Sequence, residues 1–162
     1  MADPVYFDYS NVTKTIVQAM KSLGITLIQA DSAGDQPAYP FATYTITTPK
    51  IPIGNQAGPQ QAEEFELVVS LTFKSQSAIQ ALNLAEQAQQ YLRSNTGRSF
   101  LLDNGGLVLV SVQGFTNRDN FISINYERNV GFDVQLRATN PFVEELPQID
   151  QVEFAKKNEE VL

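Results

Sequence analysis

The sequence contains no cysteine and no histidine. Without these residues the chain has no disulfides, no thiolate nucleophile and no cysteine- or histidine-ligated zinc site. The Ser-His-Asp and Cys-His catalytic arrangements are excluded as well, and the side chain most often used for general acid–base catalysis is missing. These absences argue against an enzyme, and we predict no catalytic, cofactor-binding or metal-binding residue.

Charged side chains are also scarce, since they make up 18% of the 162 residues, whereas 43% are hydrophobic. A surface rich in neutral amides and hydroxyls suits protein contacts, because a neutral polar group costs less to desolvate than an ion. The net charge is −7, and the longest basic run is Lys156-Lys157. The composition therefore argues against a phosphate-binding face, although an acidic surface can let DNA pass without holding it.

Long apolar segments are absent too. No apolar stretch approaches the ~20 residues that a membrane span needs. The start, Met1-Ala2-Asp3-Pro4, lacks the features of a signal peptide. We therefore predict that the chain is synthesised in the cytosol and does not associate with a membrane. The length is that of one domain with a sizeable core.

Two segments have the apolar periodicity of helices. Residues 8–23 place an apolar side chain at every third or fourth position, and Gly24 can end that helix. Residues 76–95 repeat the pattern with small residues that allow close packing on a sheet, and Gly97 marks the predicted stop. The predicted core faces are Val12, Ile16, Met20 and Leu23 in the first helix, and Ile79, Leu82, Ala85, Ala88 and Leu92 in the second.

Alternating and β-branched residues predict the strands. The clearest is 65–73, where Phe65, Leu67, Val69, Leu71 and Phe73 fall on one face. Asp103-Asn104-Gly105-Gly106 predicts a tight turn between two strands rather than a calcium loop, since the spaced acidic ligands of such a loop are missing. The predicted strands are 25–28, 41–48, 65–73, 100–102, 107–112, 121–126 and 130–136.

This order of elements predicts an α+β fold, in which two main helices pack on one side of a mostly antiparallel sheet. Segment 49–61 is rich in proline and glycine, so we expect it to be the projecting tip of a long hairpin. The tip is either a disordered loop or an arm that orders against a neighbouring subunit through Ile51 and Ile53. Residues 1–140 are expected to form the domain, and 141–162 a charged C-terminal tail.

Acidic residues were considered as catalytic groups. Glu63, Glu64 and Glu66 could supply carboxylates for glycoside chemistry, but no apolar pocket is evident that would raise the pKa of one of them. A solvated strand edge is the preferred interpretation.

Further along the chain, Asp119, Glu127 and Asp133 could also cluster in space. We expect Glu127 with Arg128, and Asp133 with Arg137, to form surface or intersubunit ion pairs.

Two short motifs resemble one protein family. Tyr39-Pro40-Phe41-Ala42-Thr43-Tyr44 resembles the opening of the first long strand in phage neck and tail terminator proteins. The stretch from Tyr126 to Val134, written Tyr-Glu-Arg-Asn-Val-Gly-Phe-Asp-Val, resembles a second stretch of the same proteins, with Asn129 in place of the second Arg of the usual pair. The resemblance covers roughly residues 9–140 and leaves out the tail after Pro141.

The resemblance implies a structural virion protein without cofactors. Such proteins form a ring, typically a hexamer, that caps the tail tube, ends its growth and gives the head connector a surface to bind, while DNA passes through the lumen. Ring closure needs two different patches on each copy. The expected interface comprises the exposed sheet edge and Ile51, Ile53, Asn55, Gln56, Glu64, Glu66, Arg128, Arg137 and Phe154.

Three other functions fit the sequence. A head-completion or head–tail adaptor protein would have the same low charge and a similar arm, and would differ by binding the portal side rather than the tail tube. An enzyme would need a concave pocket with converging acids of shifted pKa. A monomeric binding module would not self-assemble.

Overall fold

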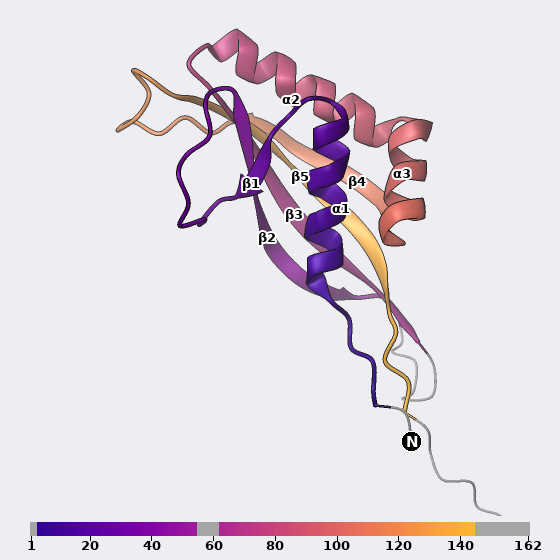
Figure 1. Ribbon diagram of the computed structural model, residues 1–162. Helices are drawn as coiled ribbons and strands as arrows, with labels where there is room; N and C mark the ends of the chain where they lie inside the picture. Colours follow the sequence, from indigo (N-terminus) through magenta and orange to yellow (C-terminus); the bar gives the residue numbers. More distant parts are fainter. Residues whose placement is uncertain (1–2, 55–61, 145–162) are drawn as a thin grey trace, which may run out of the picture.

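The computed structural model describes residues 3–54 and 62–144, which form three helices and five strands (Figure 1). The helices are α1 (Tyr9–Ser22), α2 (Ala78–Arg93) and α3 (Asn95–Gly105). The strands are β1 (Leu27–Gln29), β2 (Phe41–Pro52), β3 (Glu63–Ser75), β4 (Val108–Asn117) and β5 (Arg128–Asn140). No helix among these residues is long and apolar enough to cross a membrane.

The strands form one sheet in the order β1-β2-β3-β5-β4. Only β1 and β2 run parallel, and the other three pairs are antiparallel. The central pair, β3 and β5, is in register along its whole length, from Glu63 opposite Asn140 to Ser75 opposite Arg128. The predicted α+β class and mostly antiparallel sheet are confirmed.

All three helices cover the same face of the sheet (Figure 1). The alternation predicted for 65–73 is confirmed, since the five apolar side chains of that face are buried beneath the helices. β5 contributes the matching row, namely Val130, Phe132, Val134, Leu136 and Ala138. Burying a large apolar side chain stabilises the fold by about 1.5–3 kcal/mol, so these two rows hold the helices on the sheet.

The first helix agrees with its prediction. Asp8 precedes α1, and its side chain accepts a 2.9 Å hydrogen bond from the backbone N–H of Ser10. That bond satisfies one of the free amides at the helix start. The predicted stripe faces the core, with Val12, Ile16 and Met20 buried.

The predicted core face of the second helix is partly wrong. Ile79 is 65% exposed and Leu82 is 40% exposed, whereas alanines and Leu92 are buried. The helix approaches the sheet through its small side chains, and this turns the two larger ones outward. Gly97 does not end this helix, because α2 stops at Arg93 and Gly97 lies inside α3.

The predicted strand at 100–102 and the turn after it are wrong, because residues 95–105 form α3. Gly106 caps that helix in the left-handed conformation, with a φ of 62°. The N–H of Leu107 then donates to the carbonyl of Leu101 at 3.1 Å, a bond typical of a helix C-terminus. Asn and Gly mark hairpin turns and helix ends alike, which explains the misassignment.

The predicted strand at 121–126 is also wrong. These residues form turns in the loop between β4 and β5, and they pair with no strand among the described residues. The strand predicted at 130–136 is confirmed as the middle of β5.

The predicted hairpin is described only in part. β2 extends to Pro52 and pairs antiparallel with β3, from Phe41 opposite Lys74 to Pro52 opposite Phe65. Strand structure therefore reaches into the first residues of the segment expected to be irregular. The tip, residues 55–61, lies outside the described residues, as does most of the C-terminal tail, 145–162.

Candidate functional site

The face of the sheet opposite the helices is polar, and no helix of the described chain covers it (Figure 1). Because side chains alternate along a strand, the residues between the buried ones of β3 and β5 point to this face. They are Glu66, Val68, Ser70, Thr72 and Lys74 from β3, and Asn129, Gly131, Asp133, Gln135 and Arg137 from β5. We call this surface the open face and treat it as the candidate site.

One end of the open face carries a cross-strand ion pair. Arg137 Nη2 lies 2.8 Å from Oε1 of Glu66, directly across from it in the β3–β5 register. The side-chain amide of Gln135 donates to the other carboxylate oxygen. The hydrogen bond from Arg137 lowers the pKa of Glu66, and this outweighs the opposite effect of burial. A lowered pKa is the reverse of what a general acid needs.

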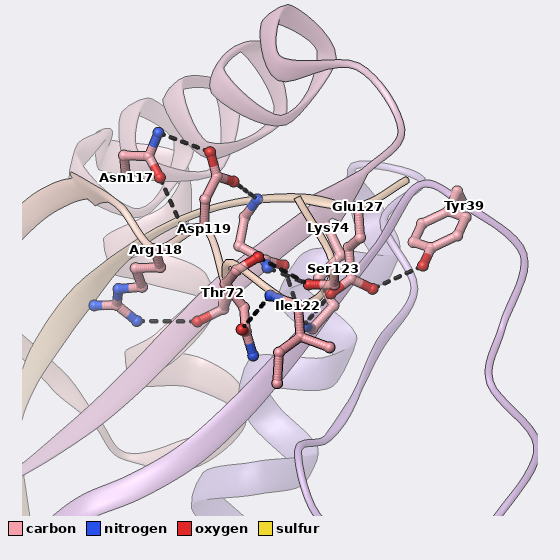
Figure 2. A network of polar contacts seen from close by, with 11 residues as sticks. Tyr39, Thr72, Lys74, Asn117, Arg118, Asp119, Ile122, Ser123 and Glu127 are labelled. Atoms are coloured by element: carbon pink, nitrogen blue, oxygen red, sulfur yellow. Dashed lines mark hydrogen bonds and ion pairs between the residues drawn. The ribbon is translucent and has the colours of Figure 1, made fainter. Parts of the chain in front are cut away.

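The middle of the open face is crossed by Arg118, which follows β4. Its Nη1 donates to Ser70 Oγ at 2.7 Å and to Thr72 Oγ1 at 3.0 Å, and its Nη2 pairs with Asp133 at 3.1 Å. The guanidinium therefore reaches over β5 to bind β3 (Figure 2). Gly131 makes this path possible, because a Cβ at that position would lie 2.8 Å from the guanidinium carbon of Arg118.

The third cluster is centred on Glu127, whose side chain is only 12% exposed. One carboxylate oxygen accepts a 2.7 Å bond from the hydroxyl of Tyr39, and the other pairs with Lys74 Nζ at 3.2 Å (Figure 2). Asn129 bonds both Lys74 and Glu127 through its side chain. Burial alone would raise the pKa of Glu127, but the bonds from Tyr39 and Lys74 together hold it below its ordinary value.

The fourth cluster closes the base of the β4–β5 loop. Asp119 accepts a 2.8 Å bond from Arg128 Nε and a 2.7 Å bond from the backbone N–H of Asn129. Asn117 donates a further bond to it at 3.0 Å. Burial would raise the pKa of Asp119, and these hydrogen bonds reverse the shift and lower it.

Within one chain, the two ion pairs expected from the sequence are therefore wrong. Arg128 pairs with Asp119 rather than Glu127, and Arg137 pairs with Glu66 rather than Asp133. Glu127 ends the loop before β5 and turns toward Tyr39 and Lys74, whereas Arg128 begins the strand and turns toward Asp119. Four cations and four carboxylates of the open face and its loop instead pair within one chain.

The structure separates the other residues expected at an interface. Glu64 is exposed at the start of β3, and Ile51 and Ile53 are half-buried at the end of β2. Asn55, Gln56 and Phe154 lie outside the described residues.

The sequence reasoning missed Arg118 and Tyr39 as members of the polar network. One signal in the sequence could have indicated the role of Tyr39, because Tyr39 and Glu127 each belong to one of the two recognised motifs.

No cluster of three or more acidic side chains that could hold a metal ion exists within 3–54 and 62–144. The shallow hollow on the open face, lined by Thr47, Val68, Ser111 and Asp133 among others, has a volume of about 260 Å³. It contains one carboxylate, already paired with Arg118, and offers no converging acids.

The comparison with protein families is decisive, because the chain matches the family of phage neck terminator proteins over residues 10–160. The chain belongs to this family. The match extends beyond the region of the two motifs and includes most of the C-terminal tail. None of the curated proteins compared with the chain matches it.

As a phage neck terminator protein, the chain is a structural component of the virion neck, with a role in head–tail joining that involves other phage tail and head proteins. The structure also brings the two motifs of this chain into contact with one polar network. Tyr39 of the first motif bonds Glu127 of the second, and Gly131 of the second motif lets Arg118 cross β5. The motifs therefore maintain one polar network on the open face.

Proposed function

We propose that copies of this phage neck terminator protein form a ring, with six subunits expected, that caps the tail tube. The ring ends tube growth and offers its outer end to the head connector, and DNA passes through its lumen. The family match over residues 10–160 carries this proposal, since it covers nearly the whole chain. The role is structural and needs no catalytic group or cofactor.

The open face supports assembly by large, shape-matched contacts. Its charged groups are already paired within one chain, so packing a neighbour over it leaves no isolated charge. The hydrogen bonds between β3, β5 and Arg118 also make the face rigid before it meets a partner, which lowers the entropy lost on binding.

The net charge of −7 supports a lumen that does not retain DNA. The four ion pairs of the open face and its loop sum to zero, so the acidic excess comes from the rest of the chain. We infer that DNA passes acidic or neutral surfaces and meets no basic patch that would hold it.

We expect edge-strand pairing to contribute little to the contact between subunits. β4 forms one edge of the sheet, but its pairing with β5 is irregular between Leu109 and Ser111 and again between Gln113 and Thr116. Such irregularities twist an edge and interrupt its row of free backbone groups. Side-chain contacts are therefore expected to dominate the subunit interface.

The test uses tail tube protein of the same phage, polymerised with increasing amounts of the purified chain. We expect shorter tubes that carry a ring at one end in negative-stain images. Tubes of unchanged length with bare ends would contradict the proposal. A ring that binds the head connector and ignores the tube would instead favour the alternative, a head–tail adaptor of the neck.

A further inference from the structure

Two apolar side chains stand out on the surface of the loop between β4 and β5. Phe121 is 94% exposed and Ile122 is 85% exposed, the two highest values among the large hydrophobic residues of the described chain. We call this pair the knob. Leaving two such side chains in water is unfavourable, and an exposed aromatic beside an aliphatic residue is typical of a protein contact.

The knob is held in place before any contact. Asn120 accepts a 3.0 Å bond from the N–H of Ile122 through its side chain and another of 3.0 Å from the N–H of Ser123 through its carbonyl. The N–H of Glu127 bonds the carbonyl of Ser123 at 2.7 Å, and Asp119 closes the base of the loop through Arg128. A loop ordered in this way loses little entropy when it docks.

A hollow of about 400 Å³ lies at the other end of β5. It is bounded by the segment before α1, the end of α3 and the end of β5, and includes Tyr6, Phe7, Ala138 and Pro141. The loop precedes the first residue of β5, and the 13-residue strand separates it from the hollow by about 40 Å. Figure 1 shows the β4–β5 loop and the start of α1 at opposite ends of the sheet.

We propose that the knob of one copy docks into this hollow of a second copy. The inference rests on the proposed ring, and it assigns the two different patches that a heterologous contact requires. The charged groups of the loop are paired within their own chain, so docking brings no unpaired charge toward Asp8, which lines the hollow and caps α1. A rigid strand links the two patches, so each contact sets the direction of the next.

The size of the contact predicts how assembly proceeds. A buried aromatic side chain removes about 150–250 Å² from water, and a stable pair of proteins buries about 1,200–2,000 Å² in total. Knob and hollow alone are therefore too small for a lasting dimer. Closure of a ring uses both patches of every copy, so rings are expected at high concentration or on the tail tube, without a stable dimer.

Cross-linking tests the contact directly, because the chain has no natural cysteine. Ile122→Cys and Thr139→Cys chains are mixed and oxidised, in solution over a concentration series and on tail tubes. Thr139 is exposed and lines the hollow. We expect a disulfide-linked pair of the two variants. The control mixes Thr139→Cys with Gln87→Cys, an exposed position in the middle of α2.

A second arm replaces the knob with Phe121→Ser and Ile122→Ser together. Because both side chains are exposed, the melting temperature should stay unchanged, while ring formation falls on the order of tenfold or more. Ile79→Ser, which removes another exposed apolar side chain, is the matched control and should form rings normally.

The outcomes separate the inference from the proposed function. Normal capping by the double serine variant, with no cross-link above the control, would overturn the knob contact and leave the ring intact. A cross-link from Ile122→Cys to the tube or connector protein instead of a second copy would also overturn it. If the wild-type chain fails to cap tubes, the proposed function fails, and the cross-link in solution still decides whether knob and hollow meet.

Discussion

The hydroxyl of Tyr39 donates a 2.7 Å hydrogen bond to Oε2 of Glu127, 88 residues further along the chain. Tyr39 lies in the connection before β2, and Glu127 ends the loop before β5, two strands that are not neighbours in the sheet. The bond ties these segments to Lys74 at the end of β3. The stability of this corner should therefore depend on each member.

Tyr39→Phe removes the hydroxyl and leaves Glu127 with one bond fewer. A hydrogen bond to a charged group contributes about 1.5–3 kcal/mol, so we expect the free energy of unfolding to fall by about that amount. Urea denaturation followed by circular dichroism measures the change. Tyr44→Phe is the control, since the Tyr44 hydroxyl bonds none of the described residues, and an equal loss in both variants would contradict the prediction.

Stability should fall at acid pH. The pKa values of Glu66 and Glu127 lie below the ordinary 4.5, and that of Asp119 lies below 3.8. Between the lowered and the ordinary values the unfolded chain binds protons that the folded chain does not, so stability is complete above about pH 5 and is lost as the pH falls further.

Urea midpoints from pH 7 to pH 3 measure this dependence. Glu127→Gln should make the decline shallower, because one of the carboxylates with a lowered pKa no longer titrates. Glu86→Gln, an exposed position on α2, serves as the matched control. An unchanged slope in Glu127→Gln would show that the Tyr39–Lys74 corner does not contribute.

Gly131→Ala should be strongly destabilising. The added Cβ would clash with the carbonyl oxygen of Leu71 and would lie 2.8 Å from the Arg118 guanidinium, so the strand or the arginine must move. Overpacking of this kind costs about 1–3 kcal/mol. Thermal unfolding measures the loss. Gly34→Ala, whose new Cβ would meet only Ser32 Oγ at 3.6 Å, should stay within about 0.5 kcal/mol of wild type.

Asp119→Asn should loosen the β4–β5 loop without unfolding the sheet. The new side-chain amide lacks the negative charge that binds Arg128, and it accepts a weaker hydrogen bond from the N–H of Asn129. We expect faster hydrogen exchange at that N–H and unchanged exchange in the middle of β3. Asp35→Asn, in the exposed connection before β2, is the control. Equal protection of Asn129 in wild type and Asp119→Asn would rule out this role.

The spacing of apolar residues was sufficient to predict a helix or strand where a single periodicity ran through the whole segment. The alternation of 65–73 predicted both β3 and its buried face, and the spacing of Val12, Ile16 and Met20 predicted α1. Such segments bury one face whatever their neighbours are, so the apolar face predicted from the sequence is also the buried face in the structure. The two family motifs were recognisable for the same reason, because their residue types are visible in sequence.

Local pattern failed where distant segments decide the conformation. Residues 121–126 alternate like a strand, yet they form turns that connect β4 to β5 and pair with no strand of the described chain. Residues 103–106 read as a hairpin turn, but Leu101 is buried against the core, and this holds residues 95–105 as a helix that Gly106 ends. Ile79 points outward because the alanines of α2 let the helix sit closer to the sheet.

Contiguous residues were enough to predict the α+β class, the strands of the sheet centre and the family, because periodicity and short motifs are local properties of the chain. The folded sheet was needed to show which charges pair, that Arg118 crosses Gly131, and that Phe121 and Ile122 are exposed on an ordered loop. The paired charges lie between 9 and 71 positions apart in the chain, and their geometry exists only once the sheet register between β3 and β5 is set.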